Sequence, residues 1–383
     1  MAQQDSADPV PLLRDLIRCA SVTPEDAGVL DVVERALTSL GFTVTRLRFE
    51  GDGSYPVDNL FATRGSGDRH LLFCGHTDVV PPGDASLWTH DPFGAEVVDG
   101  TLYGRGAVDM KSGIAAFIAA VAGAPADGKI SVAITNDEEA ENINGTAKLM
   151  DWANAQGHRF TFAIVGEPSS TAMVGDSIKI GRRGSFNGRI VVNGIQGHVA
   201  YPDRAKNPLP VAAALMLALS GKLDDGTAHF PPSNLEFTNV HVGNSVTNAI
   251  PAAADLRFNV RYNDLWTPET LASAVLDTIA GQDSSGCEIR FEMVGRQSRS
   301  FISEPGGEVQ ALVETIAEVT GRSPELSTAG GTSDARFIAP FCPVVECGLP
   351  GPTMHKADEC VPIADVEALT GLYAAFITRF FAS

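Results

Sequence analysis

The sequence lacks the features that would place it in a membrane or on a nucleic acid. Its longest apolar stretches, residues 113–124 and 211–219, are too short to span a bilayer. It has only 28 Lys and Arg against 47 Asp and Glu, a formal net charge of -19, which would repel DNA or RNA. No basic segment followed by an apolar run opens the chain, so we expect no secretory signal and a cytoplasmic protein.

Several motifs of known chemistry are also absent. The six cysteines include no CxxC spacing, which argues against a disulfide framework and against a structural zinc site made of cysteines. The sequence contains no GxxxxGKS/T, GxSxG or HExxH, and Asp109 stands where GxGxxG requires its third glycine. Dinucleotide binding, P-loop, serine hydrolase and zincin chemistry therefore have no sequence support.

What is present fits a folded protein of more than one domain. The chain has 383 residues, of which 44% are hydrophobic and 20% are charged, an ordinary balance for a globular protein. At roughly 100–200 residues per domain, this length suggests two or three domains.

The first half alternates strand and helix patterns. We expect strands near residues 42–49, 60–63, 70–74, 130–135 and 162–165, and helices near 113–122 and 145–155. The pairs Asp8-Pro9 and Thr23-Pro24 are predicted to open two helices, with Gly41 following the second. The alternation predicts an α/β fold with a mainly parallel sheet flanked by helices, whose chemistry lies at the carboxyl ends of the strands.

The pattern changes at about residue 184. Strands near 186–192, 235–242, 255–261 and 287–293 surround helices near 208–220 and 268–280, which predicts an inserted α+β sandwich. After residue 297 the earlier alternation returns, with helices near 307–320 and 365–381 and a strand near 342–346. We therefore predict a split catalytic domain, 1–183 and 297–383, and an inserted domain, 184–296.

Acidic residues and histidines follow the predicted strands of the first domain. They are His76, Asp78, Asp109, Glu138, Glu139, Glu167 and, late in the chain, His355. Carboxylates gathered at one edge of a sheet repel one another unless cations lie between them, and two divalent metal ions would remove that conflict. Asp78 lies two residues after His76, so its carboxylate is predicted to accept the second imidazole N–H and orient the ring.

Seven motifs occur in an order that resembles the zinc-dependent M20 amidohydrolases and peptidases. They are HTDVVP (76–81), GRGAVDMKSG (104–113), TNDEEA (135–140), GEPSS (166–170), GHVAYP (197–202), GGTSDARF (330–337) and MHKADE (354–359). The resemblance covers nearly the whole chain. It implies a zinc-exopeptidase-like catalytic domain, an inserted domain for dimerisation that also acts as a lid, and a homodimer.

The resemblance also implies a site with two metal ions, Zn²⁺ or alternatively Co²⁺. His76 and Glu167 are implied to hold one ion. Glu139 and His355 are implied to hold the other, and Asp109 is implied to bridge the two. Glu138 is implied as the general base that activates a metal-bridging water, with Asp78 in support. The family also tends to have a cis peptide after the bridging residue, here Asp109–Met110.

Two residues of the inserted domain are implied to act across the dimer. His198, in GHVAYP, matches a family histidine that stabilises the oxyanion in the partner's site. Asn248, in NSVTNAIP (244–251), matches a substrate contact supplied by the partner.

Within the family, the motifs are most similar to those of enzymes that hydrolyse N-succinyl-LL-2,6-diaminopimelate to succinate and LL-2,6-diaminopimelate, a step toward lysine and peptidoglycan. That substrate carries three carboxylates, and a guanidinium matches a carboxylate with two parallel hydrogen bonds. The residues that resemble the subfamily's substrate contacts are Arg182, Arg183, Ser185, Arg261, Gly331, Thr332 and Arg336. Arg257 lies on the same strand face as Arg261 and is an alternative to it.

Two other hypotheses remain. Another M20 amidohydrolase, such as an acetylornithine deacetylase or a metallo-carboxypeptidase, would share the metal site. The GRRGS (181–185) and GGTSDARF segments favour the succinyl substrate, because a deacetylase has no succinyl carboxylate to bind. A metal-binding homologue without catalysis would have no use for a free base, and Glu138 therefore favours an enzyme.

Overall fold

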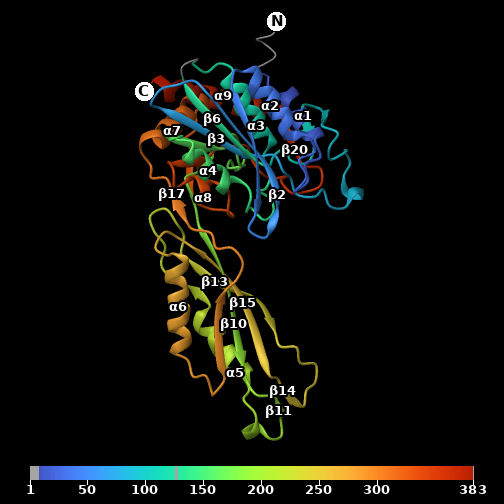
Figure 1. Cartoon of the computed structure of the whole chain (residues 1–383), viewed down its shortest axis with the longest axis vertical. Helices are drawn as coiled ribbons and strands as arrows, with labels where there is room; N and C mark the ends of the chain where they lie inside the picture. Colours follow the sequence, from blue (N-terminus) through green and yellow to red (C-terminus); the bar gives the residue numbers. More distant parts are fainter. Residues whose placement is uncertain (1–7, 126–127, 383) are drawn as a thin grey trace. The chain divides into compact units, whose positions relative to one another are not determined.

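The computed structural model describes residues 8–125 and 128–382. The chain divides into two compact units (Figure 1). Unit 1 comprises Met1–Gly181, Ser303–Ser327 and Ser333–Ser383, and unit 2 comprises Arg182–Ile302 and Thr328–Thr332. Among the described residues, no helix has the length and apolar character needed to cross a membrane.

Unit 1 is built on an eight-stranded mixed sheet in the order β1-β2-β6-β3-β7-β19-β8-β18. Its strands are β1 (Thr43–Gly51), β2 (Ser54–Arg64), β3 (His70–His76), β6 (Lys129–Thr135), β7 (Phe162–Val165), β8 (Ser177–Lys179), β18 (Glu325–Ser327) and β19 (Val344–Glu346). The central strands β6, β3, β7 and β19 are parallel, whereas β1 and β2 form an antiparallel hairpin whose second strand pairs antiparallel with β6. The predicted α/β class is confirmed.

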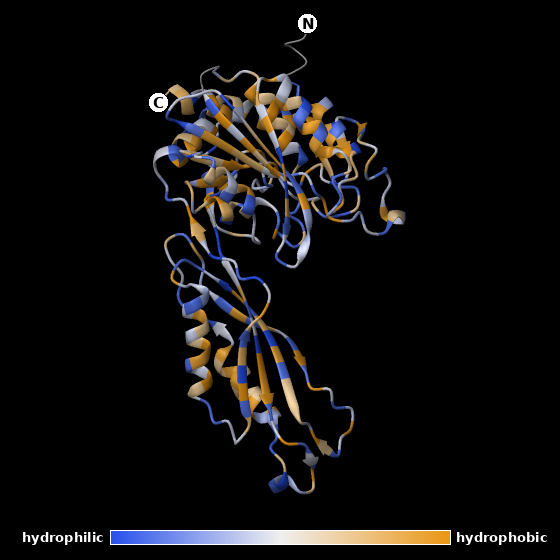
Figure 2. Cartoon of the chain, in the orientation of Figure 1, coloured by the Kyte–Doolittle hydropathy of each residue, from blue (hydrophilic) through white to orange (hydrophobic). Residues whose placement is uncertain are grey.

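Helices cover both faces of this sheet (Figure 1). They are α1 (Pro9–Arg18), α2 (Val29–Ser39), α3 (Lys111–Val121), α7 (Gly307–Thr320) and α9 (Ile363–Ala382) on one face, and α4 (Thr146–Ala155) and α8 (Ala335–Ile338) on the other. Figure 2 shows strongly apolar strands between these layers. Every residue of β3 and of α3 is buried, as expected for a parallel strand and a helix in the middle of a layered domain.

The predicted helix starts have two different outcomes. Asp8 caps α1 by accepting a hydrogen bond from the Val10 N–H, with Pro9 as the first helical residue, so this prediction is confirmed. The second prediction is wrong because α2 begins at Val29, after Gly28, and Thr23-Pro24 opens no helix. The Thr23 hydroxyl instead donates a hydrogen bond of 2.6 Å to Asp78 Oδ2. Gly41 does follow the end of α2, with a φ of 81° that favours glycine.

A small antiparallel sheet lies beside the main one in unit 1. Its order is β20-β5-β4, with β4 (Glu96–Val98), β5 (Thr101–Tyr103) and β20 (Cys360–Pro362). The sheet joins the segment that leads into α3 to the segment that leads into α9. A short 3₁₀ turn, η1 (Ala85–Leu87), precedes it.

Unit 2 contains a five-stranded antiparallel sheet in the order β12-β13-β15-β10-β16. Its strands are β10 (Gly184–Asn193), β12 (Gly221–Lys222), β13 (Asn234–His241), β15 (Ala253–Tyr262) and β16 (Glu288–Met293). Helices α5 (Pro208–Leu219) and α6 (Pro268–Ala280) cover one face. Along most of β10 and β15, buried residues alternate with partly exposed ones, and Figure 2 shows apolar and polar residues alternating along these strands. The face without helices is therefore the more polar one. The four strands and two helices predicted for this region are present.

The remaining elements of the two units are short. They are β9 (Gly181–Arg182), which pairs with β17 (Phe301–Ile302), the two-stranded antiparallel sheet of β11 (Gly197–His198) and β14 (Ala249–Ile250), and the 3₁₀ turn η2 (Pro202–Arg204).

Buried His70, at the start of β3, makes the stability of unit 1 depend on pH. Its side chain is 1% exposed, and its Nδ1–H donates to the Arg159 carbonyl while Nε2 accepts from the Ser131 hydroxyl. Burial, and then the charge of Lys129, lowers the pKa of His70 to about 4. The unfolded chain therefore binds more protons between about pH 6.5 and pH 4.

We expect this histidine to stabilise the fold fully above about pH 6.5 and to lose its contribution, about 3 kcal/mol at most, as the pH falls toward 4. Urea unfolding of the unchanged chain and of a His70→Asn variant at pH 7.5 and pH 5 tests this. The variant should lose less stability on acidification than the unchanged chain. Equal losses in both chains would contradict the assignment.

Candidate metal centre

Three neighbouring parallel strands bring the predicted site residues of unit 1 together. β3 ends at His76, Glu138 and Glu139 follow the end of β6, and Glu167 follows the end of β7. Because β6, β3 and β7 are adjacent and parallel, their carboxyl ends lie at one edge of the sheet. The fold therefore places three candidate metal ligands and the candidate base at that edge.

Asp109 comes from the loop before α3. Its backbone position depends on close packing of α3 against the end of β7, since a Cβ on Gly113 would lie 2.4 Å from the Gly166 carbonyl oxygen. Only glycine fits this approach. The cis peptide expected at Asp109–Met110 is present.

The Asp109 carboxylate lies between two histidines. Its Oδ1 is 3.2 Å from His76 Nε2, and its Oδ2 is 3.3 Å from His355 Nε2. Glu167 Oε1 is 3.5 Å from the same His76 nitrogen, and Glu139 Oε1 is 2.9 Å from the same His355 nitrogen. The arrangement is a carboxylate with one imidazole and one further carboxylate on each side, a donor set that suits two divalent cations sharing Asp109.

The protonation of His76 follows from its hydrogen bonds. Its Nδ1 is 2.9 Å from the backbone carbonyl oxygen of Asp78, and a carbonyl can only accept, so Nδ1 carries a proton. Nε2 then faces the carboxylates of Asp109 and Glu167. A histidine held in this tautomer presents the Nε2 lone pair to a metal ion.

The electrostatics of the site favour positive charge. Burial by itself lowers the pKa of His76, but hydrogen bonds to Asp109 and Glu167 raise it well above the ordinary value. Hydrogen bonds to Asp109 and Glu139 raise the pKa of His355 to about 10. Burial, and then the charge of Asp109, raises the pKa of Glu167 to about 8. His76, His355 and Glu167 thus favour protonation, because the site concentrates negative charge that bound cations could also neutralise.

Glu138 lies beside His76 and Glu167. One of its carboxylate oxygens is within 4.8 Å of ligand atoms of His76 and Glu167. Burial, and then the charge of Glu167, raises the pKa of Glu138 well above its ordinary value. A carboxylate with a raised pKa takes up a proton more readily, as a general base requires.

The side chain of Asp78 has a different contact from the one predicted. Its Oδ1 is 3.7 Å from His76 Nδ1, and the imidazole donates instead to the Asp78 backbone carbonyl. The fully buried carboxylate accepts hydrogen bonds from the backbone N–H groups of Glu138, at 3.1 Å, and Glu139, at 3.0 Å. Asp78 therefore fixes the segment that carries the candidate base and one candidate ligand.

In unit 2, a second set of predicted residues gathers at one end of β10 and β15. Ser185 pairs with Arg261 across these strands, and the charge of Arg183 adds to the burial that lowers the pKa of Arg261. Arg182 is 9% exposed and donates to the Ala329 carbonyl at 3.1 Å.

The alternative arginine, Arg257, lies elsewhere on the sheet. It is exposed and pairs with Arg189 across β10, whereas Arg261 pairs with Ser185. The structure thus groups Arg261, and not Arg257, with the predicted substrate contacts of unit 2.

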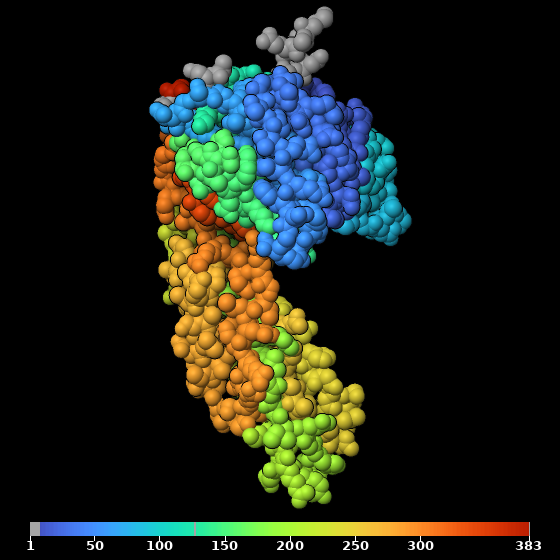
Figure 3. All heavy atoms as spheres, in the orientation of Figure 1, coloured from blue at the N-terminus to red at the C-terminus, as the bar shows by residue number. Residues whose placement is uncertain are grey.

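The remaining predicted residues fall into separate places. Gly331 and Thr332 belong to unit 2 and are exposed, and Arg336 belongs to unit 1, where it donates to the Ser333 carbonyl at 3.1 Å. His198 belongs to β11, Asn248 directly precedes β14, and the Val199 N–H donates to the Asn248 carbonyl. The paired strands β11 and β14 lie at one end of unit 2 (Figures 1 and 3). His198 and Asn248 are both exposed.

Two buried acids near the centre were not predicted. Glu359 is 0% exposed and contacts the loop that carries Asp109. Asp334 is 3% exposed and accepts a hydrogen bond of 2.5 Å from Thr146 Oγ1. Both lie inside motifs that the sequence analysis identified, but only the folded chain reveals what they contact.

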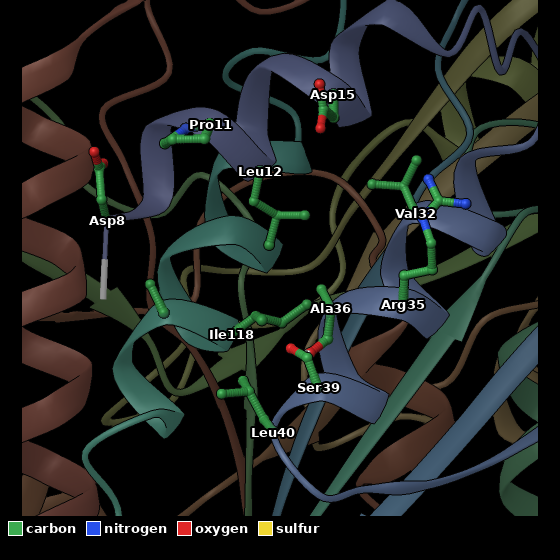
Figure 4. A pocket seen from close by; sticks show the side chains of 11 residues that line it. Asp8, Pro11, Leu12, Asp15, Val32, Arg35, Ala36, Ser39, Leu40 and Ile118 are labelled. Carbon is green, nitrogen blue, oxygen red and sulfur yellow. Dashed lines mark hydrogen bonds between the residues drawn. The ribbon is translucent and has the colours of Figure 1, made fainter. Parts of the chain in front are cut away.

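A groove elsewhere in unit 1 is separate from this centre. Its volume is about 330 Å³, and its walls come from α1, α2 and the end of α3. Figure 4 shows the side chains of Leu12 and Ile118 extending into the space between these helices, with Asp15 on α1 and Arg35 on α2. None of its lining residues is a candidate metal ligand.

The fold and the site define a member of peptidase family M20/M25/M40. The chain belongs to this family, whose sequence pattern matches residues 72–379. A succinyl-diaminopimelate desuccinylase from Rhodopseudomonas palustris (strain BisA53) is 52% identical to it over 382 residues, 98% of this chain and 99% of that protein. A protein of the same name from Nitrobacter hamburgensis is 51% identical over 390 residues, 98% of this chain and 100% of that protein. The predicted family is confirmed.

Solved structures of the same fold include more distant proteins. The aminopeptidase PepT from Bacillus cereus has a TM-score of 0.80 at 20% identity, covering 99% of each chain. The YXEP protein of Bacillus subtilis, described as a dinuclear metal binding peptidase from the M20 family, has a TM-score of 0.68 at 17% identity, covering 98% of each chain. At these identities the likeness is one of fold.

Proposed function

We propose that this protein is a metal-dependent amidohydrolase that converts N-succinyl-LL-2,6-diaminopimelate to succinate and LL-2,6-diaminopimelate, a step in lysine and diaminopimelate biosynthesis. The observation that carries the proposal is the full-length identity of about half with relatives named succinyl-diaminopimelate desuccinylase. The convergence of the predicted ligands and base in unit 1 supports a hydrolytic reaction.

Two divalent metal ions, Zn²⁺ or alternatively Co²⁺, are the proposed cofactors. His76 and Glu167 would hold one ion, Glu139 and His355 the other, and Asp109 both. Two Nε2 atoms and four carboxylate oxygens facing one another support this assignment. Bound in this way, the ions would polarise the amide carbonyl and lower the pKa of a water.

Glu138 is the proposed general base. Its carboxylate takes a proton from the attacking water, whose oxygen bonds to the succinyl carbonyl carbon. The C–N bond of the amide then breaks, and the protonated Glu138 gives its proton to the leaving amine nitrogen. Asp78 positions Glu138 for both transfers through the backbone N–H bonds of Glu138 and Glu139.

The arginines of unit 2 are the proposed contacts of the substrate carboxylates, together with Ser185, Gly331, Thr332 and Asn248, and with Arg336 of unit 1. The close grouping of Arg182, Arg183 and Arg261 supports this role. Like charges gathered in a partly buried place are stabilised by an anion. A substrate with three carboxylates supplies such an anion.

Arg261→Lys tests the substrate contact, with Arg257→Lys as its matched control on the same face of β15. Lysine keeps the charge but loses the paired hydrogen bonds of a guanidinium. We expect Arg261→Lys to raise the KM for N-succinyl-LL-diaminopimelate about tenfold or more and Arg257→Lys to leave it within about twofold. Steady-state kinetics measure both, and a larger effect of Arg257→Lys would reverse the assignment.

The same kinetics on the unchanged chain separate the desuccinylase from the other M20 activities. N-acetylornithine has the scissile amide but no succinyl carboxylate. We expect kcat/KM to favour the succinyl substrate strongly. A preference for N-acetylornithine would retain the hydrolytic centre and overturn the proposed substrate.

A homodimer is the proposed assembly, and the surface of unit 2 supports it. Helix α5 exposes an apolar stripe that includes Leu209, 40% exposed, Ala213 and Leu217, 83% exposed. Among the described residues, β13 pairs with β12 only through Asn234 and Leu235, which leaves a strand edge open. An exposed apolar helix face and an open strand edge are each typical of an interface.

A further inference from the structure

Glu359 gathers the donors of the loop that carries Asp109. Its Oε1 accepts hydrogen bonds from the backbone N–H groups of Val108, at 2.8 Å, and Asp109, at 3.2 Å. Its Oε2 accepts from the Gly106 N–H, at 3.1 Å, and from Arg105 Nη1, at 2.7 Å. One carboxylate therefore satisfies four donors within five consecutive residues.

These contacts lie in a fully buried place. Glu359 is 0% exposed and Arg105 is 2% exposed, and the guanidinium of Arg105 also lies over the ring of Trp88, 5.2 Å from its centroid. A buried loop whose N–H groups lack acceptors is costly. The carboxylate of Glu359 thus determines how the loop 104–109 can be arranged.

Glu359 also belongs to the loop that carries His355. This loop is closed by hydrogen bonds between Thr353 and Cys360, whose N–H and carbonyl both contact the Thr353 hydroxyl. The Gly104 N–H donates to the Glu359 carbonyl at 2.8 Å. The next residue, Cys360, begins β20, which pairs with β5. The two loops are therefore joined through Glu359.

We propose that Glu359 is a positioning residue for the metal centre: it holds the Asp109 loop against the His355 loop and so sets the distance between two ligands of the same ion. The inference rests on the proposed function, because it takes Asp109, Glu139 and His355 as ligands. It predicts that loss of Glu359 weakens the binding of the ion held by these three residues. The binding of the ion held by His76 and Glu167 should weaken less.

Glu359→Gln tests this proposal, because the amide keeps the shape but its NH₂ group cannot accept a hydrogen bond, which leaves one pair of donors without an acceptor. Glu359→Asp is the second variant. It keeps a negative charge beside Arg105, so the buried cation stays paired, but the shorter side chain cannot reach all four donors.

Asp358→Asn is the matched control. The Asp358 carboxylate is the neighbour of Glu359 and accepts three hydrogen bonds, from the Thr89 N–H and hydroxyl and the His90 N–H. Neither Thr89 nor His90 is a candidate metal ligand. A substitution that only weakened this part of unit 1 would act through Asp358 as well.

The measurement is a titration of Co²⁺ into the metal-free proteins, followed by calorimetry and by the visible absorption of the bound ion, with thermal unfolding of the metal-free proteins alongside. Glu139→Gln removes a ligand of one ion and identifies which equivalent belongs to that ion. We expect Glu359→Gln and Glu359→Asp to weaken this equivalent about 10- to 100-fold and the other equivalent less, and Asp358→Asn to leave both unchanged.

Two results would overturn the proposal. If the unchanged chain binds two equivalents and both Glu359 variants bind them with the same affinities, Glu359 has at most a structural role, even if the melting temperature falls. If the unchanged chain binds no Co²⁺, the proposed metal centre fails and this inference fails with it. The two failures are distinguished by the unchanged chain.

Discussion

Glu138→Gln should bind two metal ions as the unchanged chain does and lose nearly all turnover, by about 10³-fold or more. Glutamine keeps the size of the side chain but cannot take a proton from water or return it to the leaving amine. The carboxylate of Glu138 lies next to His76 and Glu167 without being needed to complete either proposed ligand set. Metal analysis and succinate release on the same preparation measure the two properties separately.

Glu139→Gln is the control, because it alters the adjacent residue on the same backbone segment. Both N–H groups contact Asp78, so the two variants disturb the segment alike. We expect Glu139→Gln to lose one metal ion along with activity. Appreciable turnover by Glu138→Gln would place the base elsewhere, and loss of an ion from it would make Glu138 a ligand.

His198→Ala should lower kcat strongly while the metal content stays that of the unchanged chain. His198 is exposed on β11, in unit 2, whereas all the proposed ligands belong to unit 1. A donor to the developing oxyanion contributes about 10²- to 10³-fold to kcat. If the histidine serves the partner's site, as proposed, its loss can be compensated by a partner that keeps it.

Mixing His198→Ala with Glu138→Gln provides that test. After subunit exchange, each mixed dimer of a two-fold symmetric enzyme has one site with both residues intact, so an equal mixture should regain about a quarter of full activity. Activity that stays at the level of the separate variants would contradict action across the dimer. A lower zinc content in His198→Ala would place this residue near the metal.

The central strands could be predicted because burial on both faces makes them continuous apolar runs. Residues 70–74, 130–135 and 162–165 were predicted as strands, and β3, β6 and β7 extend over them. Parallel order then placed His76, Glu138, Glu139 and Glu167 at one edge. Their roles as ligands and base stay predictions from the family resemblance.

The antiparallel hairpin of β1 and β2 and the small sheet β20-β5-β4 could not be predicted in the same way. β4 is exposed throughout and β5 has one buried residue, so neither has a periodic pattern long enough to recognise. The pairing of β5 with β20 joins residues more than 250 positions apart, for example Thr101 with Pro362. Such pairings follow from tertiary packing.

Side-chain partners were the least predictable part of the site. Thr23 looked like a helix cap, because a Thr-Pro pair often opens a helix, yet its hydroxyl binds Asp78. The spacing of His76 and Asp78 indicated contact between their side chains, but a backbone carbonyl takes that hydrogen bond. Both differences involve the buried carboxylate of Asp78. It accepts hydrogen bonds from Thr23 and from the backbone of Glu138 and Glu139, which are close to it in the fold but distant in the sequence.

The most direct test of the proposed activity is succinate release from N-succinyl-LL-2,6-diaminopimelate by the protein stripped of metal and then titrated with Zn²⁺. We predict no release from the metal-free protein and a rise in rate that levels off at two equivalents of zinc per chain. Release at full rate from the metal-free protein, or none with two zinc ions bound, would contradict the proposal that this chain is a two-metal desuccinylase.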